Sequence, residues 1–184
     1  ALRRACEKGI PVITYDGYIT EDLYRSSIRS DQVSLGRTTG EYARDYIAKH
    51  LGGRAKVALI EYMSLAPEIC SQRVRGFRDE IAREPGVEVV AEQDAWLAPQ
   101  ATTVAEDLMT ANPDVDIIWA ANEGGTLGAV KAVLNAGRAG RVKVFGTDIS
   151  EQLADALLAE DGVLQAVTGQ KGFDIGYTAV ENAA

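Results

Sequence analysis

Apolar and polar positions between Lys56 and Thr168 follow two alternating patterns. Short runs rich in β-branched residues predict strands, and the longer stretches between them carry apolar residues at helical spacing. The expected strands are Lys56–Tyr62, Val87–Gln93, Asp116–Ala121, Val142–Thr147 and Val163–Thr168. The helices expected between them are Pro67–Arg83, Gln100–Ala111, Glu123–Ala136 and Glu151–Ala159, and a further helix, Asp31–Leu51, is expected before the first of these strands.

Strict alternation of strands and helices predicts βαβ units, and therefore an α/β fold with a doubly wound parallel sheet. We expect the second strand to lie outside the first and the third on the first strand's other side. Ligands of such sheets bind beyond the carboxyl ends of the strands, where the strand order reverses. This rule selects the loop after Tyr62, the Asn122–Glu123 pair, and Asp148 as candidate site positions.

The two ends of the chain carry weaker signals. We expect a short N-terminal helix, strands at Ile10–Tyr15 and Tyr24–Arg29, and a last helix that begins near Phe173 and continues to the chain end. The sequence lacks an initiator Met and a signal-peptide pattern, and we interpret it as a fragment of a longer protein.

The segment WAANEGGTLGAV, from Trp119 to Val130, raises the question of a phosphate-binding glycine turn. It follows the third strand rather than the first and does not have the G-x-G-x-x-G spacing, and the chain has no P-loop sequence. Glu123 would also repel a phosphate. We expect Gly124 and Gly128 to let the helix pack close to the sheet, with Asn122 presented at the crevice.

Composition excludes several classes of function. The 184-residue chain is 46% hydrophobic and has a net charge of −8, which argues against nucleic acid or an anionic membrane surface as a partner. Cys6 and Cys70 are expected to be unpaired, buried thiols. His50, the one histidine, is expected at a helix C-terminus. No catalytic or metal-binding constellation is visible, so we expect no enzymatic activity, cofactor or metal site.

Individually, the candidate site residues have simpler structural explanations. Asn122 is suited to cap the helix that follows it, and the sequence D-I-S-E suits Asp148 to the same role. Taken alone, Arg73 would be a solvated helix arginine, Trp96 a core residue, and Gln170 carries no signal.

Taken together, these residues occur in segments that resemble a known family. The segments are GIPVITYDG with Asp16, SQRVRGFRDEI with Arg73, DAWLAPQAT with Trp96, ANPDVDIIWAANEGGTLGAV with Asn122, VKVFGTDIS with Asp148 and LQAVTGQKGFDIGYTAVE with Gln170. Their order resembles the periplasmic sugar-binding proteins of the ribose-binding type. Those proteins share a two-lobed fold with the effector domains of lactose-repressor-like regulators.

The resemblance implies that residues 31–168 form a complete C-terminal lobe and that 1–30 and 169–184 belong to a partial N-terminal lobe. It also implies ligand-binding roles for the six residues just named, and their chemistry suits a sugar. Asp16 and Asp148 can accept hydrogen bonds from hydroxyls, Arg73 and Asn122 can donate, and Trp96 offers a flat apolar face.

One position departs from the family pattern. Many relatives carry an arginine directly after the aspartate that corresponds to Asp16, whereas this chain has Gly17. The difference argues against ribose as the ligand and is compatible with another monosaccharide or a polyol.

The resemblance implies the substrate-binding component of a sugar ABC transporter. Such a protein is expected to be a periplasmic monomer or an extracellular lipoprotein that closes on its ligand by hinge motion and delivers it to a membrane permease. The alternative is the sugar-responsive effector domain of a lactose-repressor-like regulator. A signal peptide upstream would select the first, and a helix-turn-helix upstream would select the second.

Overall fold

The computed structural model describes residues 1–17, 19 and 21–183. Contacts along the chain divide it into two compact units. One unit comprises Ala1–Asp31 together with Gln170–Ala184, and the other comprises Gln32–Gly169.

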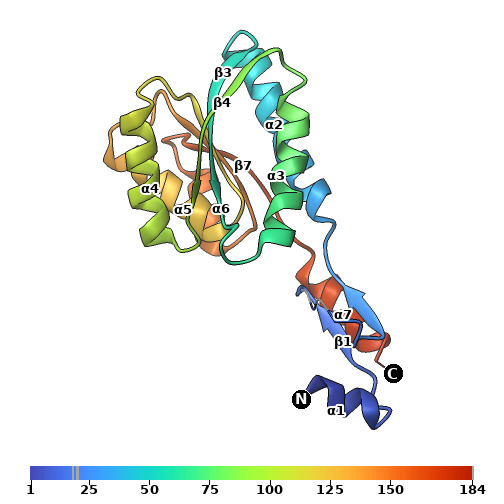
Figure 1. Cartoon of the computed structure of the whole chain (residues 1–184). Helices are drawn as coiled ribbons and strands as arrows, with labels where there is room; N and C mark the ends of the chain where they lie inside the picture. Colours follow the sequence, from blue (N-terminus) through green and yellow to red (C-terminus); the bar gives the residue numbers. More distant parts are fainter. Residues whose placement is uncertain (18, 20, 184) are drawn as a thin grey trace. The chain divides into compact units, whose positions relative to one another are not determined.

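The Gln32–Gly169 unit is built on a five-stranded sheet (Figure 1). Its strands are β3 (Arg54–Glu61), β4 (Gly86–Asp94), β5 (Ile117–Ala120), β6 (Lys143–Thr147) and β7 (Leu164–Thr168). All neighbouring pairs are parallel, and the strand order is β4-β3-β5-β6-β7. The second strand therefore lies outside the first and the third on its other side, which confirms the predicted doubly wound α/β fold.

Five helices cover the two faces of this sheet. They are α2 (Gln32–His50), α3 (Pro67–Ile81), α4 (Ala98–Ala111), α5 (Glu123–Asn135) and α6 (Glu151–Leu158). Helices α2 and α3 lie on one face, and α4, α5 and α6 lie on the other (Figure 1). Successive residues of β3 alternate between the two cores: Leu59 packs with the α2–α3 cluster, and Ala58 and Ile60 with the opposite one. Burial on both faces explains why these strands are continuous apolar runs.

Glycines set the spacing between α2 and α3. A Cβ added to Gly36 would lie 1.9 Å from the carbonyl oxygen of Arg73, and one added to Gly76 would lie 2.0 Å from that of Val33. The two backbones thus touch directly, and any larger residue at either glycine would force the helices apart.

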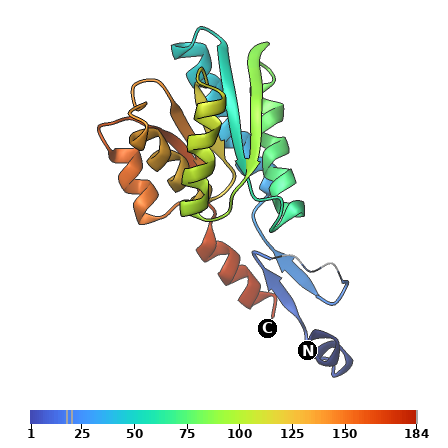
Figure 2. The same ribbon diagram turned by 60° about the vertical axis from the view of Figure 1, so that its left-hand side comes forward.

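The other unit is small. It contains α1 (Leu2–Glu7), the parallel pair β1 (Ile13–Tyr15) and β2 (Ser26–Ile28), and α7 (Gly172–Glu181). Helix α7 packs on both strands (Figure 2). Its Ile175 and Ala179 are the buried hydrophobic residues of this unit among those described.

Several expectations for this smaller unit are wrong. Cys6 is exposed, because α1 buries none of its residues, whereas Cys70 is buried as expected. The first strand begins at Ile13 rather than Ile10, and α7 ends at Glu181 instead of continuing to the chain end.

The glycines of α5 also act differently from the prediction. An added Cβ on Gly124 would collide with the backbone of Trp96, just before α4, and one on Gly128 would collide with Ala101, in the first turn of α4. The atoms nearest to both belong to this segment rather than to the sheet. The glycine that faces the sheet is Gly125, beside the Cβ of Ala120.

Within the described residues, no helix is both long and apolar enough to cross a membrane. The same residues contain no cluster of three or more His, Cys, Asp or Glu side chains arranged to hold a metal ion.

Candidate functional site

The candidate site lies at the carboxyl edge of the parallel sheet in the Gln32–Gly169 unit. Tyr62 follows β3, Trp96 follows β4, Asn122 follows β5 and Asp148 follows β6. Because these strands are parallel, their ends meet at one edge, and the backbone N–H of Glu123 donates to Oδ2 of Asp148 at 3.3 Å. The predicted placement of Asn122 and Asp148 at a shared edge is therefore confirmed.

Arg73 projects into this edge from α3. Its residue is only 4% exposed, which overturns the simple explanation of a solvated helix arginine. Nε donates to Oε1 of Gln32 at 2.6 Å, and Nη1 donates to the carbonyl oxygen of Ala121 at 2.8 Å. The guanidinium also lies 5.7 Å from the ring centroid of Tyr62. A buried arginine held from several sides is a rigid donor rather than a mobile surface charge.

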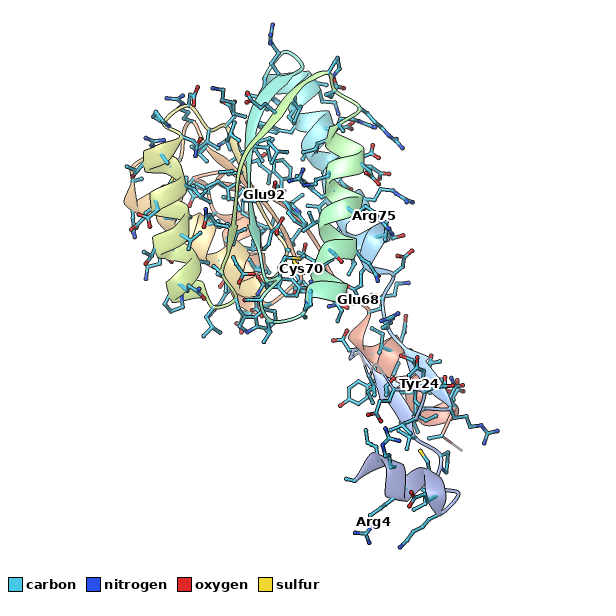
Figure 3. All side chains as sticks on the ribbon, viewed as in Figure 1. Arg4, Tyr24, Glu68, Cys70, Arg75 and Glu92 are labelled. Carbon is cyan, nitrogen blue, oxygen red and sulfur yellow. The ribbon has the colours of Figure 1, made fainter. Side chains whose placement is uncertain are left out.

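The two sides of α3 differ in burial. Cys70 lies on the side of the helix that faces the sheet, whereas Arg75 extends from its outer side (Figure 3). Burial raises the pKa of the Cys70 thiol to about 11, so this cysteine is an inert core residue.

Asp148 has an unusual backbone. Its φ is +74°, in the left-handed region that L-residues rarely adopt. Its amide donates to the carbonyl of Thr168 at 2.7 Å, and Oδ2 lies 3.5 Å from Nη1 of Arg73. Asp148 is not the helix cap, because α6 begins at Glu151 and Ser150 accepts the capping hydrogen bond from Leu153. A strained aspartate beside a buried arginine is typical of a functional position.

Asn122, in contrast, is the N-cap of α5. Its Oδ1 accepts from the amide of Gly125 at 3.1 Å, and its Nδ2 donates to the carbonyl of Trp96 at 2.9 Å. The side chain thus joins the start of α5 to the loop after β4. Capping explains why this residue type suits the position, and it fixes the amide at the site edge.

Trp96 is 41% exposed, so it is not the core residue that a tryptophan taken alone would be expected to be. Its ring meets the buried Tyr62 edge-on, with centroids 5.1 Å apart. A partly exposed aromatic side chain that contacts a buried ring suits packing against the apolar face of a ligand.

Asp16 and Gln170 belong to the smaller unit. Asp16 is exposed, has a φ of +46°, and its amide donates to the carbonyl of Ile28 at 2.9 Å. Gln170 is half-buried directly after the strand β7 and the intervening Gly169. The structure thus brings Arg73, Asn122 and Asp148 together in one unit, whereas Asp16 and Gln170 lie in the other.

Two contributors to the site were missed in the sequence. Gln32 is 2% exposed and binds Arg73, and Tyr62 is 2% exposed and lies between Arg73 and Trp96. Gln32 gives no signal in the sequence, because a glutamine in the first turn of a helix is ordinarily solvated. Tyr62 could have been found, since it ends a buried strand at the edge where ligands bind.

The fold and this edge define a class of protein: a doubly wound α/β lobe with a polar site where the strand order reverses. The chain belongs to the periplasmic binding protein domain family, whose match covers residues 1–184. This finding confirms the resemblance seen in the sequence.

Individual relatives support the same assignment. The chain is 37% identical over 180 residues to the ABC transporter periplasmic-binding protein YphF of Escherichia coli, covering 95% of this chain and 54% of the relative. It is 36% identical over 185 residues to the ribose import binding protein RbsB of Escherichia coli, covering 100% of this chain and 59% of the relative. The chain therefore spans somewhat more than half the length of these curated relatives.

Solved structures agree with this fold. A periplasmic solute-binding protein from Actinobacillus succinogenes with bound D-allose superposes with a TM-score of 0.86 at 29% identity, covering 99% of this chain and 65% of that one. GanP, a glucose-galactose binding protein from Geobacillus stearothermophilus, gives a TM-score of 0.84 at 26% identity, with 99% and 63% covered.

Proposed function

We propose that this chain is part of the substrate-binding component of a sugar ABC transporter and that it binds a monosaccharide or a polyol. The observation that carries the proposal is the juxtaposition of Arg73, Asn122 and Asp148 at the carboxyl edge of the sheet, beside the partly exposed Trp96. The names of the relatives, which include ribose, allose and glucose-galactose binding proteins, support the same class of ligand.

The chemistry of the edge favours a neutral polyhydroxylated ligand over an anion. Arg73 already has Asp148 as a counter-charge at 3.5 Å, and the Asp148 carboxylate would repel a second negative group. A sugar hydroxyl can accept from the guanidinium and donate to the carboxylate at once. Trp96 would cover the C–H face of the ring.

The remaining assignments complete the site. Asp16 and Gln170 contribute from the smaller unit, Asp16 as an acceptor and Gln170 through its amide. We assign residues 31–168 to one lobe of a two-lobed protein and residues 1–30 with 169–184 to part of the other lobe. The complete protein would bind its sugar by hinge closure.

The setting follows from the same proposal. The protein would work as a monomer in the periplasm, or outside the membrane as a lipoprotein, and would deliver sugar to a membrane permease. It would have no enzymatic activity. The periplasmic location named for several relatives supports this assignment.

A thermal-shift screen of the complete polypeptide against monosaccharides and polyols tests the ligand class. A ligand that binds only the folded state at a hundred times its Kd stabilises that state by about 2.7 kcal/mol, which raises the melting temperature. We expect a shift with at least one aldose or polyol and none with sugar-free anions such as phosphate. A shift with phosphate alone would contradict the proposal.

Asp148→Asn then tests the site itself. Asparagine tolerates positive φ, so the fold should persist, whereas the charged acceptor is lost. We expect sugar affinity by titration calorimetry to fall by about 1–3 kcal/mol. Asp155→Asn removes an exposed carboxylate of α6 and serves as the control. Equal affinities for the two variants would exclude Asp148 from the binding site.

A further inference from the structure

We propose that Gln32 is the positioning residue of the ligand site, and that it orients the Arg73 guanidinium so that Nη2 faces the sugar. The inference rests on the proposed function, because it takes Arg73 to be a ligand-binding residue.

The contact between the two side chains is short and enclosed. Oε1 of Gln32 accepts from Nε of Arg73 at 2.6 Å, and the two residues are 2% and 4% exposed. A hydrogen bond to a charged donor is among the stronger kinds, and burial removes competition from water. Gln32 is the first residue of α2, directly where the chain enters the Gln32–Gly169 unit.

The five N–H donors of the guanidinium divide unequally. The single Nε donor binds Gln32, and Nη1 binds the carbonyl of Ala121 and the carboxylate of Asp148. Nη2 donates to no acceptor in the described part of the chain. It is therefore the part of the guanidinium that remains available to an acceptor brought by a ligand, such as a sugar hydroxyl.

Gln32 and Ala121 together fix the plane of the guanidinium. Gln32 accepts a hydrogen bond from Nε, and the carbonyl of Ala121 accepts one from Nη1. Rotation about the last side-chain torsions of Arg73 would therefore break at least one of these two hydrogen bonds. Without Gln32, the guanidinium keeps Ala121 and Asp148 on a single nitrogen and gains freedom to turn. The direction of Nη2 therefore depends on Gln32.

The close contact of α2 with α3 at Gly36 and Gly76, called the α2–α3 seam below, explains why Gln32 can hold this position. Gly36, one turn further along α2, lies against the backbone of Arg73 itself, at 1.9 Å for an added Cβ. Gly76 lies one turn after Arg73 on α3 and meets α2 at Val33. The acceptor on α2 and the donor on α3 are thus carried by two helices in backbone contact, and such rigid elements hold a binding group more closely than a loop does.

Three variants of the complete polypeptide test the inference. Gln32→Leu removes the acceptor at similar volume, and Gln32→Glu keeps an acceptor at the same reach. Gln152→Leu makes the same change at an exposed position of α6 and is the matched control. If Gln32→Leu does not fold, Gln32→Asn replaces it, because the shorter side chain withdraws the acceptor by one methylene.

The first measurement needs no ligand. The Nε–Hε proton of Arg73 is followed by ¹⁵N NMR and assigned by its disappearance in Arg73→Lys. We expect slow exchange with water in the wild type, in Gln32→Glu and in Gln152→Leu, and exchange at least about tenfold faster in Gln32→Leu. Unchanged exchange in Gln32→Leu would overturn the positioning role.

The second measurement is sugar affinity by calorimetry, with the ligand found in the thermal-shift screen. We expect Gln32→Leu to bind about ten- to hundredfold more weakly and Gln32→Glu to bind within about threefold of the wild type. A purely structural role would instead lower the melting temperature and leave affinity unchanged, which would overturn the inference. If the wild type binds no sugar or polyol, the proposed function fails, and with it the ligand-facing role of Nη2; the exchange measurement still judges the Gln32–Arg73 contact.

Discussion

Asn122 shows how one side chain can be both a structural cap and a candidate ligand contact. Its Oδ1 caps α5 and its Nδ2 holds the loop that carries Trp96. The hydrogen bonds that stabilise the start of α5 therefore also set the geometry of the site edge. A substitution here affects stability and binding together, and variants must separate the two effects.

We expect Asn122→Ala to lower the free energy of unfolding by about 1–2 kcal/mol, because the cap of α5 is lost. Asn122→Ser keeps a capping oxygen and should lose less than about half of that. Urea denaturation measures both. Sugar affinity should fall in both variants by about 1–3 kcal/mol, because neither retains the amide. Wild-type sugar affinity in Asn122→Ser would show that Asn122 acts only as a helix cap.

Glu61 is a residue whose burial changes the pKa of its carboxyl. It ends β3, and its Oε1 is buried without a hydrogen-bond partner in the described structure. Desolvation raises the pKa of the Glu61 carboxyl, an effect that the nearby Arg78 partly offsets. The folded protein therefore binds this proton more tightly than the unfolded chain does. The contribution of Glu61 to stability is most favourable at acidic pH and is lost as pH rises through the raised pKa.

The corresponding variant is Glu61→Gln, which keeps the shape and removes the charge. We expect it to be more stable than the wild type at pH 7.5, with the difference shrinking as the pH falls toward the ordinary glutamate range. Urea denaturation across this pH range measures the effect. Glu160→Gln, at an exposed position, is the control and should show no such trend. A constant difference at every pH would contradict the assignment.

At the scale of elements, the close contact of α2 and α3 supports the site. Gly36 and Gly76 allow the backbones to touch, and Gly40 continues the contact toward Glu80, whose buried carboxylate accepts from Arg44 and Arg83. The helix pair carries both Gln32 and Arg73, so the spacing of the helices and the geometry of the binding arginine are set by the same packing.

Gly36→Ala tests this seam. The added methyl would lie 1.9 Å from the carbonyl oxygen of Arg73, a backbone atom that cannot rotate away, so the helices must separate. We expect a loss of about 1–3 kcal/mol in the free energy of unfolding, and more if the helices cannot adjust. Gly140→Ala lies in the same unit with no atom within 4 Å of the added Cβ and should change stability by less than about 0.5 kcal/mol. Equal stability of the two variants would show that α2 and α3 can move apart at Gly36 without loss of stability.

At the scale of the whole molecule, the two units differ in how much apolar surface they bury. The core belongs almost wholly to Gln32–Gly169, whereas the described part of residues 1–31 contains no buried hydrophobic side chain. A two-stranded sheet is marginally stable in water, and its open edges can pair with other chains. The smaller unit therefore has little stability of its own.

We expect amide exchange in residues 1–30 of the 184-residue chain to be faster than in β5, whose four residues are all buried. Hydrogen-exchange mass spectrometry measures this difference. Comparable protection in both regions would show that the chain is stable as one piece.

The proposed two-lobed site gives a related expectation for binding. The 184-residue chain should bind the sugar of the complete polypeptide at least about a hundredfold more weakly, equivalent to roughly 2.7 kcal/mol, because part of one lobe would be missing. Calorimetry on both proteins, with the Asp148→Asn variant as a reference for weakened binding, measures the difference. Equal affinities would mean that these residues contain the whole site.

The sequence by itself determined the fold class, the strand order and the edge where candidate residues gather. These follow from local periodicity and from the rules that govern parallel sheets, and both act over short stretches of chain. Asn122 and Asp148 were found in this way, because each directly follows a predicted strand. The family resemblance, which the comparisons confirm, added Arg73.

Only the tertiary structure decided how these residues are held. The left-handed backbone of Asp148 arises where β6 pairs with β7 and the chain then turns toward α6, which no local pattern encodes. The contact of Gln32 with Arg73 spans 41 residues and depends on two helices meeting at glycines. The exposure of Cys6 likewise depends on tertiary packing, because none of the residues of α1 is buried against another element. Local sequence sets the elements, whereas burial, strain and side-chain orientation depend on contacts between residues far apart in the chain.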